Sequence, residues 1–232
     1  MNKRRRYRAV LLLGTVGLLL AGVWGLWLRS YRHQEVLNRQ LVAALVKQDT
    51  AQALELVNAG ADPNTLCEPL LPLSFRQLWN FLLHHAPLSI NGGDTAFCLA
   101  CGSPLPGGGD IIGMVRDSPE LVRSMIQHSA HLNTHDDIGF TPLIRAACSD
   151  HPQTISVLLD NGAEINAVDD SGDTALMRVA SQRTSPRTMT LLLNHGANLD
   201  LSNKDGETAL RLAQDDSQAD LVALLKQAGA KK

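Results

Sequence analysis

Hydrophobic and polar positions divide the chain into one long apolar run and a series of short apolar clusters. Residues 9–28 form an unbroken run of 20 residues without a charged side chain. Beyond residue 33, apolar residues come in short clusters at helical spacing, separated by polar turns rich in Gly, Asp and Asn. The pattern predicts short paired helices over most of the chain, preceded by one long apolar helix.

The C-terminal part of the chain repeats one motif three times. Its threonines are 33 and then 34 residues apart: Thr141, Thr174 and Thr208. Its glycines are 34 and then 33 residues apart: Gly162, Gly196 and Gly229. Each threonine is placed to N-cap a short first helix, and each glycine to end a longer second helix in the left-handed conformation. Pro152 and Pro186 suit the first position of that second helix. A fixed period in this range is typical of stacked repeats.

The motif T-x-L-x-x-A, followed by an apolar helix and G-A-x-x-N/D, resembles the ankyrin repeat. The resemblance is closest over 134–232 and weaker over 92–133 and 36–64. It implies an all-α fold, an ankyrin-type α-solenoid of about five helix-pair repeats. One helix pair cannot bury its apolar face alone, so neighbouring copies must stack. The resemblance also implies a protein that binds another protein and is not an enzyme.

Five segments are expected along the chain. They are a basic cytosolic N-terminus (1–8), a transmembrane signal-anchor helix (9–28), a degenerate capping repeat (33–64), an irregular insertion with an extra helix and part of a repeat (65–118), and regular repeats (119–232). Within the irregular segment, 75–85 predicts an amphipathic helix, and Thr95 is expected to start the first helix of a repeat. A turn-rich stretch at 102–109 then separates that helix from its partner.

The apolar run has the length and flanks of a membrane span. At 1.5 Å per residue, 9–28 would extend roughly 30 Å, the thickness of a bilayer's hydrocarbon core. More basic residues precede the run than follow it, so the positive-inside rule predicts a cytosolic N-terminus and extracytoplasmic repeats. In a Gram-negative bacterium the repeats would be periplasmic. A cleaved signal peptide followed by secretion remains the alternative.

Charge is segregated along the chain. Residues 134–232 contain 9 Lys and Arg against 14 Asp and Glu, a balance of about −5 (9 − 14). In ankyrin repeats the inter-repeat turns project along the concave binding side, so the resemblance implies an acidic edge there. The implied partner-binding residues in these turns are Asp137, Phe140, Asp170, Asp173, Lys204 and Glu207. We expect a protein partner with a basic patch, and no nucleic acid, because phosphates would be repelled. No small-molecule substrate and no cofactor are expected.

Cys98-Leu-Ala-Cys101 is the pattern that leaves an enzymatic or metal-binding alternative open. A redox pair would need a strand-to-helix setting, whereas this pair falls in a repeat helix. Cys67 and His84 or His85 would complete a permitted zinc ligand set with the pair, but at irregular spacing. An extracytoplasmic location favours a structural disulfide, for example from Cys67 to Cys98 or Cys101.

Overall fold

The computed structural model of the chain describes residues 29–66, 95–102, 116–136, 138–182 and 185–230. In these ranges the fold is all-helical and contains no β-strand. A long N-terminal helix covers 29–46. The helices that follow are α2 (Thr50–Asn58), α4 (Ala96–Cys101), α5 (Pro119–Gln127), α6 (Pro142–Cys148), α7 (Pro152–Asp160), α8 (Ala175–Ser181), α9 (Pro186–Asn194), α10 (Ala209–Asp215) and α11 (Ala219–Gln227).

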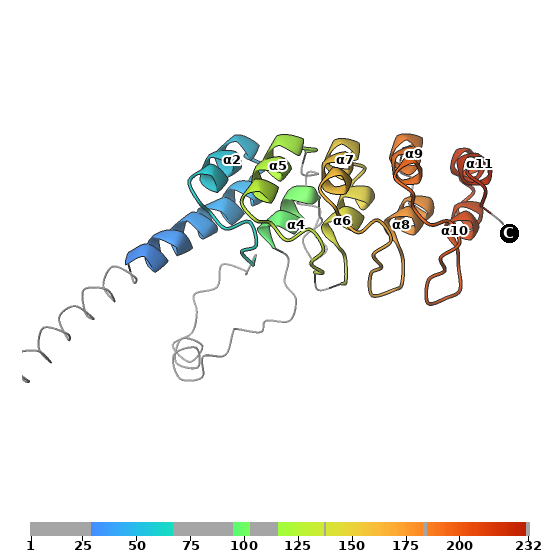
Figure 1. Cartoon of the computed structure of the whole chain (residues 1–232), viewed down its shortest axis with the longest axis horizontal. Helices are drawn as coiled ribbons and strands as arrows, with labels where there is room; N and C mark the ends of the chain where they lie inside the picture. The colour runs from blue at the N-terminus through green and yellow to red at the C-terminus, as the bar shows by residue number, and fades with distance from the viewer. Residues whose placement is uncertain (1–28, 67–94, 103–115, 137, 183–184, 231–232) are drawn as a thin grey trace, which may run out of the picture.

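The helices form two parallel rows, as Figure 1 shows. The first helices of successive pairs, α4, α6, α8 and α10, pack against one another in one row. The second helices, α2, α5, α7, α9 and α11, form the other row. Turns project from the side of the first row, away from the second. The described part of the chain is therefore a solenoid of five stacked helix pairs, counting the N-terminal helix with α2.

The repeated threonines cap the first helices as the sequence predicts. The hydroxyl of Thr141 accepts a hydrogen bond from the backbone N–H of Ile144, and Thr174 and Thr208 act in the same way on α8 and α10. Thr95 caps α4 identically, so a repeat does begin there. A side-chain cap satisfies one of the N–H groups that a helix leaves unpaired at its start.

The second helices begin and end at the predicted residues. Pro152 and Pro186 stand at the first turn of α7 and α9, and Pro119 does so for α5. Gly162 follows α7 with a φ of 91°, a conformation that costs glycine no Cβ clash. These local signals fix the length of each second helix at 9 residues in the regular units.

One continuous apolar core runs the length of the stack, from Leu41 in the N-terminal helix to Leu225 in α11. The paired alanines of the first helices, such as Ala146 and Ala147, are fully buried, which lets neighbouring helices approach closely. Each pair thus covers the apolar face of the next, as a one-dimensional repeat array requires.

The repeat that contains α4 and α5 differs from its neighbours at two places. An antiparallel bridge joins Leu66 to Thr95, equivalent to the bridges from Val168 to Thr174 and from Ser202 to Thr208. The first bridge encloses 67–94, whereas the other two enclose 169–173 and 203–207. The second difference is the connection from α4 to α5, which spans 102–118, whereas α6 and α7 are joined by 149–151. The predicted helix at 75–85 and most of the turn-rich stretch lie outside the described residues.

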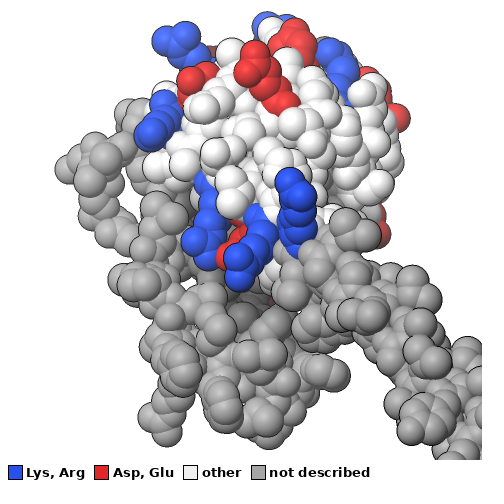
Figure 2. Space-filling view, turned by 90° about the vertical axis from the view of Figure 1, so that its left-hand side faces the viewer, with Lys and Arg blue, Asp and Glu red and all other residues white. Residues whose placement is uncertain are grey.

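The N-terminal helix is longer than the other first helices and extends beyond the stack (Figure 1). Its fully buried residues, Leu41, Ala44 and Leu45, all lie in its last turns. The preceding part, 29–39, is exposed or half-buried and includes the exposed Arg29 and Arg32. Figure 2, which views this end of the molecule, shows Lys and Arg side chains near the top and in a group lower on the same face, with Asp and Glu among them.

None of the helices in the described residues is both long and apolar enough to cross a membrane. The run at 9–28, which the sequence predicts to be a membrane span, lies outside the described residues.

Candidate interaction surface

Three turns closed by the same backbone hydrogen bond form the projecting edge of the stack. We call them the first finger (136–140), the second finger (169–173) and the third finger (203–207). In each, the N–H of the first residue donates to the carbonyl of the fifth at 3.0 Å: Asp136 to Phe140, Asp169 to Asp173, and Asn203 to Glu207. The side-chain oxygen of the first residue also accepts two backbone N–H groups, for example those of Ile138 and Phe140 at 2.9 and 2.8 Å. An Asp or Asn is therefore needed at this position to hold the turn.

Neighbouring fingers pack closely against each other. Gly139 has a φ of 76°, and a Cβ on it would lie 2.5 Å from the backbone nitrogen of Asp170. Between the second and third fingers, Lys204 donates its backbone N–H to the Ser171 carbonyl at 3.1 Å, and its Nζ to the Asp170 carbonyl at 2.5 Å. The fingers thus form one continuous edge.

A buried ion pair anchors the first finger to the helix behind it. Arg145 on α6 donates its Nε to Oδ2 of Asp136 at 2.5 Å, and its Nη2 contacts the same oxygen. The side chain of Asp136 is 0% exposed and that of Arg145 only 4%. Burying two charges costs several kcal/mol per ion, and close pairing with further hydrogen bonds offsets the cost.

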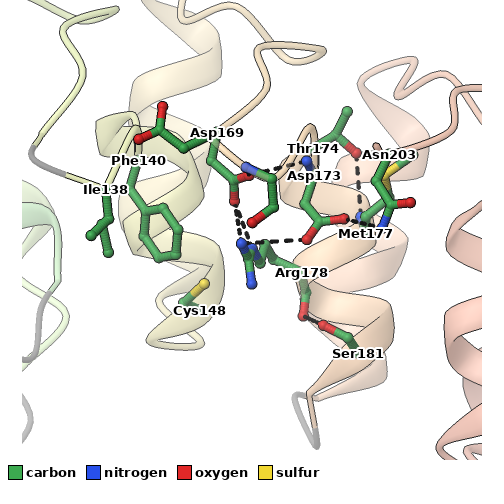
Figure 3. Close-up of polar contacts among 12 residues, drawn as sticks. Ile138, Phe140, Cys148, Asp169, Asp173, Thr174, Met177, Arg178, Ser181 and Asn203 are labelled. Atoms are coloured by element: carbon green, nitrogen blue, oxygen red, sulfur yellow. Dashed lines mark hydrogen bonds and ion pairs between the residues drawn. The ribbon is translucent and has the colours of Figure 1, made fainter. Parts of the chain in front are cut away.

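The second finger repeats this arrangement and adds a carboxylate (Figure 3). Arg178 on α8 donates its Nε to Oδ2 of Asp169 at 2.7 Å, and its Nη2 also lies 3.3 Å from Oδ2 of Asp173. Asp173 accepts a further hydrogen bond from the side-chain amide of Asn203 in the third finger, at 2.8 Å. The ion pair therefore also links two successive fingers.

Phe140 and Ile138 give the first finger an apolar outer face. Phe140 is half-buried, and the Arg178 guanidinium lies 4.9 Å from its ring centroid, a cation–π contact between the first finger and α8. Ile138 is 52% exposed. Val168, which immediately precedes the second finger and forms the bridge to Thr174, is 46% exposed. Figure 3 shows Ile138 and Phe140 side by side, next to Arg178. Large exposed apolar side chains on adjacent turns are typical of a contact surface.

Several aspartates of the expected acidic edge are buried, so that edge is less acidic at its surface than the sequence predicts. Asp173, predicted to face a partner, is 8% exposed and is held by Arg178 and Asn203. Asp136 and Asp169 are likewise buried and paired. The sequence alone did not indicate this pairing, because the arginines lie on the following helix and not in the turns. The available signal was an Asp followed nine residues later by an Arg at the repeat period, in Asp136 with Arg145 and in Asp169 with Arg178.

The remaining predicted residues are distributed unevenly along the fingers. Asp170 and Lys204 are exposed. Glu207 is half-buried and lies 3.6 Å from the Nε of Arg211 on α10. Asp137 lies outside the described residues. The structure thus brings Phe140, Asp170, Lys204 and Glu207 to one edge, alongside Ile138 and Val168, which sequence reasoning missed. Their role in binding stays a prediction.

The cysteine pair lies inside the helical core. Cys98 and Cys101 are buried free thiols on α4. Burial raises the pKa of the Cys98 thiol and raises that of Cys101 well above its ordinary value. A redox or nucleophilic cysteine needs a lowered pKa and access to solvent, so this environment argues against the redox alternative. Cys67 lies outside the described residues, and the predicted disulfide to it stays a prediction.

No group of three or more metal-ligating side chains occurs among the residues that the structure describes. His84 and His85, proposed with the cysteines as a zinc set, fall outside those residues. The zinc alternative therefore has no support from the described part of the chain.

Comparison with known proteins agrees with the geometry. The family model described as ankyrin repeats (3 copies) matches residues 41–169 and 162–232. No curated protein matches the chain. The family match covers most of the sequence and coincides with the capped helix pairs and the finger turns. The chain belongs to the ankyrin repeat family.

Proposed function

We propose that this protein is a membrane-tethered scaffold that binds another protein through its finger edge and the adjoining concave face. The observation that carries the proposal is the exposure of Ile138 and Val168, at 52% and 46%, on neighbouring turns. Neither side chain belongs to the core cluster, so each is free to contact a partner. Ankyrin repeats in general mediate protein–protein interaction, which supports the same reading.

The partner's chemistry follows from what remains exposed on the edge. Ile138 and Val168 suit a partner that presents apolar residues to them. Such buried anchor contacts carry much of the binding energy at protein interfaces. The exposed carboxylates of Asp170 and Asp205 suit basic residues around those anchors. Because Asp136, Asp169 and Asp173 are paired internally, the edge is less acidic than its sequence, and we propose apolar anchoring first and charge second.

A photo-crosslinking experiment tests this proposal. A photoreactive residue in place of Ser171, exposed on the second finger, should capture the partner from cells of the source organism. The double variant Ile138→Ser/Val168→Ser should lose that product. Val46→Ser is the matched control, since Val46 is 55% exposed but lies on the N-terminal helix. Unchanged capture by the double variant would exclude these side chains as anchors.

The tether rests on the sequence of 9–28, an uncharged run of 20 residues. The helix of 29–46 follows it directly, and its first part, with the exposed Arg29 and Arg32, extends away from the repeats. We propose a single-pass arrangement with a cytosolic N-terminus and extracytoplasmic repeats, in the periplasm if the source is Gram-negative.

Reporter fusions test the topology. An export-dependent reporter placed after Lys232 should be active, and a cytosolic reporter at the same position inactive. The reverse result would place the repeats in the cytosol and remove the argument for a disulfide. A mature N-terminus beginning after residue 20 would show cleavage and secretion instead of anchoring.

A further inference from the structure

The row of second helices carries a groove of its own, on the opposite side of the stack from the fingers. Its volume is about 620 Å³, and every residue that lines it belongs to α5, α7 or α9. Because α7 packs between α5 and α9, the groove has α7 as its floor and the two other helices as its walls. It shares no residue with the finger edge.

The floor of this groove is uncharged, and the charged side chains of its walls are two arginines and one glutamate. Pro152, Gln153 and Ser156 of α7 line the floor. Arg123 on α5 and Arg187 on α9 line opposite walls, and both are exposed. Glu120 is the acidic residue in the lining, so the lining carries a net charge of +1, from two guanidinium groups and one carboxylate.

The two arginines have no partner within the described residues. The arginines that the fold uses, Arg145 and Arg178, make buried or half-buried ion pairs with the fingers. Arg123 and Arg187 make neither an ion pair nor a hydrogen bond to any described residue. Within the described residues, the fold therefore gives these two guanidinium groups no ion-pair or hydrogen-bond role. The forked donors of arginine match a carboxylate in two-point hydrogen bonding.

We propose that this groove binds an extended acidic segment of a second protein partner, with a carboxylate on each arginine. Neighbouring helix axes are about 8–10 Å apart, so the walls are separated by roughly 20 Å between axes. An extended peptide advances about 3.3 Å per residue, so carboxylates about five residues apart suit the two arginines. The protein would then bridge two partners, one on the fingers and one on the second-helix row.

The test is a binding titration with a defined probe. The probe is a fluorescein-labelled peptide of glycine and serine that carries two glutamates about five residues apart, and fluorescence anisotropy with the full chain in non-ionic detergent measures its affinity. Arg123→Gln and Arg187→Gln should each weaken binding by about tenfold, because each removes a charge-assisted contact. Glu120→Gln should tighten binding, since it removes the repelling carboxylate. Arg39→Gln, on the N-terminal helix, should leave the affinity unchanged.

Several outcomes would overturn the proposal. They are equal binding of the glutamine version of the peptide, equal binding by the double variant Arg123→Gln/Arg187→Gln, and preferential binding of single-stranded DNA through the same arginines. The finger variant Ile138→Ser/Val168→Ser should bind the acidic peptide normally. Loss of finger binding and loss of groove binding are therefore separate results.

Discussion

The second and third fingers share one backbone but have different electrostatic interiors. Both close the turn with the same hydrogen bond at 3.0 Å, from Asp169 to Asp173 and from Asn203 to Glu207. In the second finger the organising side chain is a carboxylate paired with Arg178. In the third it is the amide of Asn203, and the position equivalent to Arg178 is Leu212. The acceptor oxygen is thus what shapes the turn, and the charge pair is a separate addition.

The two changes in the third finger occur together for a physical reason. An Asp at 203 without an arginine behind it would be a carboxylate with no counter-charge in a half-buried site. An arginine at 212 without the Asp would be an unpaired cation in the stack. Losing one partner of a buried pair is costly, whereas losing both is nearly neutral. The third finger therefore provides a natural template for testing the first two.

The largest effect is expected from removing one half of the most buried pair. Arg145→Leu copies Leu212 but leaves Asp136, with its 0% exposed side chain, without its counter-charge. We expect the free energy of unfolding to fall by about 3–5 kcal/mol, measured by urea denaturation followed by circular dichroism. Arg211→Leu is the control, because Arg211 is 65% exposed and its loss should change stability by less than about 0.5 kcal/mol.

The double variant Asp136→Asn/Arg145→Leu converts the first finger into the third. Asparagine keeps the oxygen that accepts the N–H groups of Ile138 and Phe140. We expect it to recover most of the loss, to within about 1 kcal/mol of wild type. A double variant as unstable as Arg145→Leu alone would mean that the charge pair, and not the acceptor oxygen, holds the turn.

The reverse exchange, from the third finger's asparagine to the aspartate of the other fingers, should lower the free energy of unfolding by a smaller amount. Asn203→Asp replaces an amide that donates to Asp173 at 2.8 Å with a carboxylate that repels it. We expect a loss of about 2 kcal/mol in unfolding free energy. Leu212→Arg in the same chain should recover part of it, by supplying the arginine found in the other two units. Asp205→Asn, at an exposed site, serves as the control.

Glycine substitutions compare the packing of the first and third fingers. Gly139 and Gly206 have nearly the same φ, 76° and 77°. A Cβ at Gly139 would meet the Asp170 backbone at 2.5 Å, whereas a Cβ at Gly206 would meet nothing within 4 Å. Gly206→Ala should lower the free energy of unfolding by about 1 kcal/mol, because of the left-handed conformation alone. Gly139→Ala should lower it by about 2 kcal/mol, because the new Cβ also meets the Asp170 backbone. Equal losses in thermal or urea unfolding would show that the fingers do not pack closely in solution.

The sequence predicts the helices better than the edge because helix ends are set locally. A capping threonine such as Thr174, a proline such as Pro186 and a glycine such as Gly196 each act within one turn of chain. The pairing of Asp173 depends instead on Arg178 and on Asn203, which comes from the next repeat. The groove between α5, α7 and α9 likewise joins side chains from three repeats. Such contacts need the stacking geometry, which a single repeat motif does not specify.

The smallest effect is a pH dependence at Cys148, which has a serine counterpart, Ser181, one repeat later. Burial raises the pKa of the Cys148 thiol from 9.0 to about 11, with Arg178 and a hydrogen bond from Gln182 lowering it in part. Below pH 9 the thiol is protonated in both the folded and the unfolded chain and contributes nothing to pH dependence. Between pH 9 and about 11 the unfolded chain loses the proton first, so the folded state loses stability as pH rises.

Cys148→Ser should remove this part of the decline while leaving that of Cys98 and Cys101 in place. Between neutral pH and about pH 10, we therefore expect the free energy of unfolding to fall on the order of 1 kcal/mol further in wild type than in Cys148→Ser. Parallel series of urea unfolding measurements check this. Superimposable pH profiles for the two proteins would mean that Cys148 titrates normally and that this site, where the C-terminal ends of α6 and α8 meet, is open to water.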